Sequence, residues 1–411
     1  MSPFLLFSFV IGYFIILLVV AWYTSRNSDN ESFFIGNRNS NWMLVAFGMI
    51  GTTLSGVTFV SVPGTVGSGG FQYFQVVLGY FLGYLVIAYV LLPLYYRMNL
   101  TSIYNYLEHR FGMTSYKTGA TYFILSRTLG ATARMYLVVN ILQLFILDSM
   151  GIPFWLTALV ILILILLYTF EGGVKTIVYT DTLQTSCMLI GLVVCIIAIM
   201  NKMNLDFSST MTAMSEKGMT RIFNTDVNSS AFFIKQILGG AFITIAMTGL
   251  DQEMMQKNIS VRTLGGSQKN VMTLSVVLLF VNFLFLLMGG LLYLYADSMG
   301  LQVKGDDLFP AVALGSYLSA AIGVIFIIGF ISALFTSADG ALTARTSSFC
   351  IDILGLKRRP DLSGESLKAF SMTVFGGFKI GIELLIINGL LTFAGLWLIS
   401  RKGGTSEMNL H

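Results

Sequence analysis

Long uninterrupted apolar segments constrain this sequence more than any other feature. Runs of about 20 apolar residues, each long enough to cross a bilayer as a helix, recur along the whole chain. They predict about ten spans, at residues 3–22, 41–66, 73–96, 118–147, 152–170, 177–200, 231–250, 271–296, 319–346 and 375–400. Only helices and closed barrels satisfy every backbone polar group in lipid, and these runs are too long and continuous for barrel strands. We therefore expect an all-α integral membrane protein.

The composition excludes several other classes of protein. The 411 residues are 55% hydrophobic and only 11% charged, whereas a soluble domain carries about a quarter charged residues. This deficit argues against a soluble enzyme, a nucleic-acid-binding protein and a disordered chain. The two histidines, His109 and His411, cannot build a transition-metal site. Because the sequence also offers no nucleophile–base pair, we expect that the protein is not an enzyme.

The loops between the spans differ in charge, and this difference predicts their orientation. With the N-terminus outside, most loop lysines and arginines face the cytoplasm, as the positive-inside rule requires. The first span has no charged leader, so we interpret it as a retained helix. Only the end of the chain breaks the pattern, because Arg401 and Lys402 would lie outside. We expect a multi-pass protein of the plasma (inner) membrane, with helices missing before the last span.

Two spans carry polar runs at depths where polar groups are costly. The second span reads GTTLSGVT at 51–58, and the ninth reads SALFTSADG at 332–340. A broken helix, whose freed carbonyls bind a cation, would explain the first run. Close packing of small residues would also explain the first run, and hydroxyls that bond back to their own helix would explain the second.

The two runs are expected at the same depth in the membrane. Gly51 and Thr336 each lie about 15 Å from the inner end of their spans, since a helix rises 1.5 Å per residue. Ala333, Thr336 and Ser337 share one helix face because they are spaced i, i+3 and i+4. A hard cation prefers oxygen ligands. We therefore expect a sodium site at the midplane, formed by carbonyls and hydroxyls of Gly51, Leu54, Ala333, Thr336 and Ser337.

Three charged residues inside the spans are further candidates for function. Asp181 and Asp339 lie about 6 Å and about 10 Å from the inner face, and they are the acids best placed for a second cation. Either acid could instead pair structurally with Arg127 or Arg345. Arg134 lies about 24 Å from the inner end of its span. Its planar fork of donors suits a carboxylate. The alternatives are a structural ion pair and an end residue whose side chain snorkels to the membrane surface.

Several short motifs of this chain resemble those of one family. They read FFIGNR at 33–38, LTSIYNYLEHRFG at 100–112, GG at 172–173 with YTDTLQ at 179–184, DQEMMQK at 251–257, and TSADGAL at 336–342. Together they resemble the sodium:solute symporter family, which contains sodium-coupled sugar, proline, pantothenate and sialic acid transporters. The resemblance runs from about residue 3 to 355, and 100–112 is its most specific segment. Lys257 stands where the family usually has arginine.

The resemblance implies a LeuT-like fold, in which two inverted repeats surround a midplane site. It implies the following division: a symporter core at 1–355 with an extra first helix at 3–22, a first repeat at 41–200 and a partial second repeat at 231–350; a cytoplasmic linker at 356–374; a final helix at 375–400; and a tail at 401–411. The second repeat would lack its last helices, which would also explain the charge of the tail.

The resemblance also assigns residues to roles. The family's sodium site falls on the five residues already inferred from depth, and its solute contacts fall on Thr53, Ser55 and Thr58. Arg134 is similar to the arginine that binds the substrate carboxylate in sialic acid transporters. A second sodium in some members uses an aspartate like Asp181. Here two serines of that second site are replaced by Asp339 and Gly340, which leaves a second sodium open.

We therefore expect a sodium-coupled symporter that imports a small polar solute. Arg134 favours sialic acid or another acidic sugar, and neutral sugars and amino acids stay open. The expected partners are Na⁺, the solute and the lipid bilayer, without nucleic acid, and an oligomer stays open. The alternative from another class is a symporter-like membrane scaffold or sensor that does not transport.

Overall fold

The computed structural model describes residues 3–25, 40–100, 102–169, 173–315 and 317–355. The expected linker at 356–374, the final span at 375–400 and the tail lie outside the described residues, as does the motif at 33–38. The side chain of Asp339 also lies outside the described part.

Helices make up nearly all of the described chain, and no strand occurs in it. The helices are α1 (Pro3–Ser25), α3 (Trp42–Thr53), α4 (Gly56–Gly69), α5 (Tyr73–Val86), α6 (Leu92–Arg97), α7 (Asn105–Phe111), α8 (Met113–Leu142), α9 (Phe154–Thr169), α10 (Gly173–Met203), α11 (Phe207–Glu216), α12 (Phe233–Thr244), α13 (Gln252–Ile259), α14 (Leu264–Ser298), α15 (Leu308–Leu314) and α16 (Ala320–Ser348).

Short 3₁₀ or π segments extend or join these helices. They are η2 (Gly70–Gln72), η3 (Ile87–Leu91), η4 (Gln143–Leu147), η5 (Asp148–Met150), η6 (Ile245–Gly249), η7 (Gly305–Asp307) and η8 (Phe349–Ile353). Of these, η6 continues α12 up to the start of α13.

The described helices fit a membrane protein by length and composition. Six stretches are long and apolar enough to cross a bilayer, and α12–η6 with α13 gives a seventh if that bent pair is one span. The apolar helices α3 and α9 are shorter. Helices occupy every expected span that falls within the described residues. Because the expected last span lies outside the described residues, the total number of spans stays a prediction.

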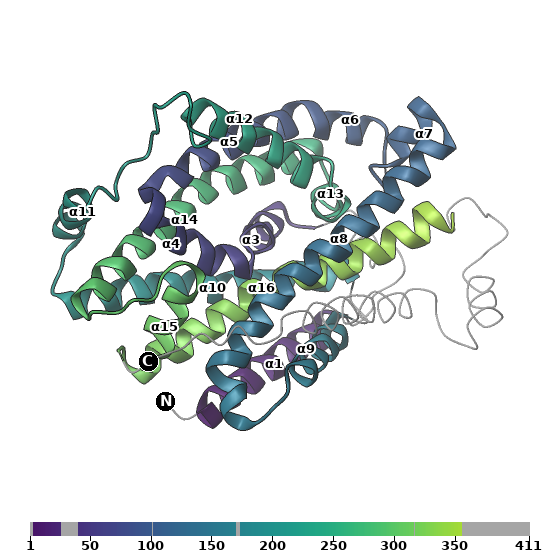
Figure 1. Ribbon diagram of the computed structural model, residues 1–411. Coiled ribbons are helices and arrows are strands. Elements are labelled where there is room, and N and C mark those ends of the chain that lie inside the picture. Colours follow the sequence, from purple (N-terminus) through teal and green to yellow (C-terminus); the bar gives the residue numbers. More distant parts are fainter. Residues whose placement is uncertain (1–2, 26–39, 101, 170–172, 316, 356–411) are drawn as a thin grey trace.

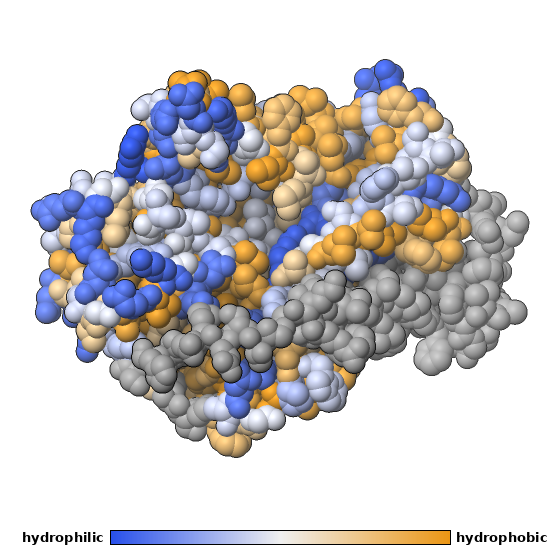
Figure 2. Space-filling view, viewed as in Figure 1, coloured by the Kyte–Doolittle hydropathy of each residue, from blue (hydrophilic) through white to orange (hydrophobic). Residues whose placement is uncertain are grey.

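The surface has apolar flanks and polar ends. Large hydrophobic side chains are exposed on the flanks of several helices, for example Leu129 of α8, Phe242 of α12 and Phe280 of α14. Hydrophilic residues gather over α11 and over the tip of α7, which lie at opposite ends of the bundle (Figures 1 and 2). The start of α1 lies toward the α11 end (Figure 1). This arrangement agrees with a loop at 204–232 that lies on the same side as the N-terminus.

Glycines allow the closest helix contacts. A Cβ on Gly79 of α5 would lie 2.1 Å from the Ile237 carbonyl oxygen, and one on Gly240 of α12 would lie 2.2 Å from the Val76 carbonyl oxygen. Because real Cβ atoms do not approach oxygen so closely, only glycine lets these two backbones meet. Such small-residue contacts are typical of helix packing in membranes.

Two helices of the bundle are interrupted. The first break, at Leu54 and Ser55, separates α3 from α4. The second, at Leu250 and Asp251, bends α13 by 66° from α12–η6. The polar run at 51–58 predicted the first break, whereas residues 231–250 were expected to form an ordinary span and α13 was not expected. Each of the two expected repeats thus begins with a broken helix, the arrangement that marks binding sites in inverted-repeat transporters.

Candidate cation and solute site

The break after α3 leaves backbone oxygens at the centre of the protein. Leu54 ends α3 with non-helical torsions (φ −92°, ψ 89°), and Ser55 is extended (φ −75°, ψ 168°). Both residues are buried. The Gly51 carbonyl oxygen, one turn before the break, accepts a hydrogen bond of 2.9 Å from the Thr336 hydroxyl of α16. The two polar runs, which the helical rise per residue placed at the same depth, are therefore in contact.

The α16 residues of the expected sodium site face this break. Ala333, Thr336 and Ser337 are all buried. The Ala333 carbonyl oxygen accepts from Thr336 at 3.3 Å and from Ser337 at 3.4 Å. Both hydroxyls thus bond back to their own helix, as the alternative interpretation predicted. Thr336 also reaches across to Gly51, which back-bonding alone does not explain.

A sixth oxygen faces the same position and was missed in the sequence. A Cβ on Gly51 would lie 2.2 Å from Thr185 Oγ1 of α10 and 3.0 Å from Thr336 Cγ2, so glycine is required here. Thr185 is fully buried, and its hydroxyl has no hydrogen-bond partner in the described part of the chain. A buried unpaired hydroxyl calls for a water or an ion. The sequence signal that could have identified Thr185 is its i, i+4 spacing from Asp181, which puts the two residues on one helix face.

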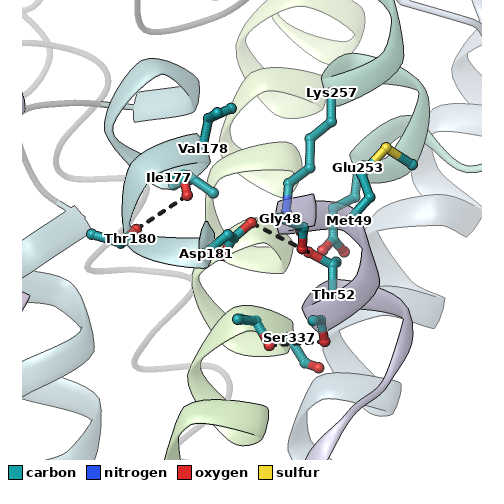
Figure 3. A network of polar contacts seen from close by, with 12 residues as sticks. Gly48, Met49, Thr52, Ile177, Val178, Thr180, Asp181, Glu253, Lys257 and Ser337 are labelled. Carbon is teal, nitrogen blue, oxygen red and sulfur yellow. Dashed lines mark hydrogen bonds and ion pairs between the residues drawn. The ribbon is translucent and has the colours of Figure 1, made fainter. Parts of the chain in front are cut away.

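Asp181 pairs with a lysine rather than with either expected arginine. Its Oδ2 lies 2.6 Å from Nζ of Lys257 in α13. Nζ also donates to the Thr52 hydroxyl at 2.7 Å, so three helices meet here (Figure 3). The predicted alternative partners, Arg127 and Arg345, bond elsewhere. Asp339, the other acid proposed for a second cation, cannot be placed because its side chain lies outside the described part.

The second broken helix is held by a buried ion pair. Arg127 of α8 donates through Nε to Oδ2 of Asp251 at 2.6 Å, and its Nη1 lies 3.6 Å from Oε2 of Glu253. Asp251 also caps α13 by accepting from the Met254 amide. The Tyr95 hydroxyl donates to the Gly249 carbonyl oxygen at 2.9 Å. These bonds satisfy the backbone polar groups and the buried charges at the bend. Lipid could not do so, because it offers no hydrogen-bond partners.

The residues proposed to contact solute differ in whether their hydroxyls already form hydrogen bonds. The Thr53 hydroxyl donates to the Met49 carbonyl oxygen at 2.8 Å. Ser55 is buried and Thr58 is half-buried, and neither hydroxyl has a recorded partner among the described residues. They lie three residues apart at the start of α4, hence on one face.

Arg134 lies near the level of the first break. Its helix, α8, contacts α4 where a Cβ on Gly56 would lie 2.8 Å from Val138 Cγ2, and Val138 is one turn beyond Arg134. The Arg134 side chain is half-buried. Within the described residues it makes no recorded hydrogen bond or ion pair, so the structural pair weighed as an alternative is not found there. Its guanidinium donors are therefore available.

The α4 half of the first broken helix is covered by a loop. The Tyr293 hydroxyl of α14 donates to the Gly64 carbonyl oxygen at 2.8 Å and accepts from the Gly305 amide at 3.1 Å. This links α4 to η7. At the end of η7, the pKa of Asp307 is raised above its usual value. Partial burial is the larger cause, and the nearby charge of Asp306 is the smaller one.

Within the described residues, no group of three His, Cys, Asp or Glu side chains could hold a metal ion. The oxygens around Gly51 and Thr336 are instead carbonyls and hydroxyls. Such neutral oxygens suit a weakly held monovalent cation better than a transition metal.

Comparisons with known proteins identify the family that this chain resembles. Residues 33–359 match the sequence model of the sodium:solute symporter family. A sodium-dependent multivitamin transporter from Oryctolagus cuniculus is 30% identical in an alignment 236 positions long that covers 56% of this chain and 36% of that protein. The sodium/sialic acid symporter SiaT from Proteus mirabilis (strain HI4320) is 22% identical in an alignment 420 positions long that covers 96% of this chain and 78% of that protein.

A solved structure shows the same fold. The substrate-bound outward-open state of a Na⁺-coupled sialic acid symporter matches with a TM-score of 0.84 and 20% identity, over 97% of this chain and 83% of that chain. The fold is thus the LeuT-like helical bundle. The matched part of this chain spans about a third of the length of the first curated relatives, 36% in each case.

Proposed function

The chain belongs to the sodium:solute symporter family, and we propose that it is a sodium-coupled secondary transporter that imports a small polar solute across the plasma membrane. The single observation that carries the proposal is the contact between the Thr336 hydroxyl and the Gly51 carbonyl oxygen at the helix break. It brings an oxygen of α3 and an oxygen of α16, both among the proposed ligands, into contact at the break. The protein is a multi-pass membrane protein.

Sodium binds between the first broken helix and α16. The carbonyls of Gly51, Leu54 and Ala333 and the hydroxyls of Thr336 and Ser337 supply the ligands. When sodium arrives, the Thr336 hydroxyl turns its proton away from the Gly51 carbonyl, so that both oxygens face the ion. Sodium thereby links α16 to α3 and α4 at the point where Thr336 contacts Gly51.

The solute binds beside the break, at the start of α4. The hydroxyls of Ser55 and Thr58 and the Thr53 side chain contact its polar groups. Arg134 binds a carboxylate, which favours sialic acid or another acidic sugar. Rocking of the helices around this midplane site would expose it alternately to each side. Each sodium charge that enters adds about 2.3 kcal/mol per 100 mV of membrane potential.

Uptake into proteoliposomes tests this function. Radiolabelled N-acetylneuraminic acid, glucose and proline are offered under an inward sodium gradient and under an equal potassium gradient. We expect accumulation of the acidic sugar with sodium only. If none of the three is taken up by protein that binds sodium, a non-transporting scaffold or sensor becomes the better interpretation, or the solute belongs to another class.

Replacing Arg134 by lysine tests the proposed carboxylate contact. Because lysine keeps the charge but loses the planar fork, binding of an acidic sugar should weaken by about 1.5–3 kcal/mol, the scale of a hydrogen bond to a charged group. Competition binding with acidic and neutral sugars measures the change. Arg221→Lys, the same substitution at an exposed arginine, is the control. Equal losses for acidic and neutral ligands would assign Arg134 to structure instead.

A further inference from the structure

A lysine ammonium lies where a second cation would be expected. Nζ of Lys257 is 2.6 Å from Oδ2 of Asp181 and 2.7 Å from the Thr52 hydroxyl. The lysine and aspartate side chains are only 4% and 1% exposed. Lys257 reaches this position from α13, beyond the second helix break (Figure 3). The charge of Asp181 is therefore already balanced from within the chain.

The glycine opposite this ammonium supports the same interpretation. A Cβ on Gly340 of α16 would lie 3.2 Å from Nζ of Lys257 and 2.4 Å from Oε1 of Glu253. A serine at position 340 could not place its hydroxyl there unless both side chains moved. The space that a hydroxyl ligand would use on α16 is thus filled by the Glu253 carboxylate and the Lys257 ammonium.

We propose that the Lys257 ammonium is a tethered cation that permanently fills the second cation position, so that each chain binds a single sodium ion. This inference deepens the proposed function and rests on it for the first sodium. It assigns Lys257 a role in setting the sodium to solute ratio. Asp181, which the sequence suggested as a ligand for a second sodium, serves as the counter-ion of Lys257.

The surroundings explain why removal of the ammonium should admit sodium. Two acidic side chains, Asp181 and Glu253, would be left without it, and the Thr52 hydroxyl would lose its donor. Both carboxylates are buried, and Oδ1 of Asp181 and both oxygens of Glu253 accept no hydrogen bond in the described part. Arg127 would still lie 3.6 Å from Glu253, whereas Asp181 would lose the lysine that balances its charge, and a buried carboxylate without a partner is costly. A position lined by such oxygens attracts a hard cation.

The test counts sodium ions through their effect on thermal stability. Wild type and Lys257→Met are purified in detergent, and melting is followed as Na⁺ replaces K⁺ at constant ionic strength. Each bound ion adds its own logarithmic dependence on concentration. We therefore expect the slope of melting temperature against log[Na⁺] to be about twice as steep in Lys257→Met as in wild type. Direct ²²Na⁺ binding should show a second saturable ion.

Two further variants make the result specific. Adding Asp181→Asn to Lys257→Met removes the carboxylate and should abolish the gained sodium. Lys217→Met makes the same change in an exposed ion pair with Asp297 and should gain none. If Lys257→Met does not fold, Lys257→Gln replaces it, because its amide can still donate to Asp181. A folded Lys257→Met or Lys257→Gln that binds no additional sodium would overturn the inference.

The outcome separates this inference from the proposed function. A wild type that binds no sodium at all contradicts the proposed function. In that case a sodium response that appears only in Lys257→Met still supports the tethered cation, and its absence overturns it. A wild type that binds two sodium ions contradicts the tethered cation and leaves sodium coupling intact.

Discussion

Replacing Asp251 by alanine should destabilise the protein by about 3–5 kcal/mol, the usual cost of leaving one partner of a buried ion pair alone. Arg127 is 7% exposed and donates to Asp251 at 2.6 Å, so its guanidinium would lose its nearest carboxylate. The same substitution removes the N-cap of α13, which adds about 1 kcal/mol. Thermal and denaturant unfolding in detergent measure the loss.

Three further variants test this expectation. Asp251→Asn keeps a side chain that caps helices well, so it isolates the contribution of the charge. Arg127→Met combined with Asp251→Ala should cost less than Asp251→Ala alone, because the buried guanidinium is removed together with its nearest carboxylate. Part of the cost remains, because Glu253, 3.6 Å from Arg127 in the wild type, loses that cation. Asp297→Ala, in the exposed pair with Lys217, should cost about 0–1 kcal/mol. If Asp251→Ala were as mild as Asp297→Ala, the pair would not hold the second broken helix.

The second large effect is expected from Thr336→Val, which keeps the shape of the side chain and removes its hydroxyl. That hydroxyl contacts the carbonyl oxygens of both Gly51 and Ala333, so it lies at the centre of the proposed sodium site. The sodium concentration for half-maximal stabilisation should rise at least about tenfold, equivalent to about 1.4 kcal/mol. Melting in a series of Na⁺/K⁺ mixtures gives this value.

The control is Thr121→Val on the exposed face of α8, where the hydroxyl only bonds back to the Lys117 carbonyl oxygen. It makes the same chemical change far from the proposed site and should leave the sodium midpoint as in wild type. A Thr336→Val protein that folds and keeps the wild-type sodium midpoint would exclude Thr336 as a ligand.

The sequence was sufficient to predict the meeting of α3 and α16. Polar residues are so rare in membrane spans that two polar runs at equal depth identify a shared site, and Thr336 does contact Gly51. The family motifs supported the same residues. Depth follows directly from residue count, since the rise of a helix is constant.

Contacts that depend on helix rotation and bending could not be predicted in this way. The segment 252–259 is rich in polar residues and reads as a cytoplasmic loop, yet it forms α13, and all its residues are buried. Lys257 and Asp181 are 76 residues apart in sequence. Nothing local indicates that a 66° bend turns that lysine toward α10. The orientation of Thr185 toward Gly51 likewise depends on how α10 packs against α3.

The most direct measurement of the central claim is equilibrium binding of ²²Na⁺ to the purified wild-type protein, which requires no knowledge of the solute. We expect saturable binding that unlabelled Na⁺ displaces, that an equal concentration of K⁺ does not displace, and that Thr336→Val weakens. A folded wild-type protein without saturable sodium binding, or one whose sodium is displaced equally well by potassium, would contradict it.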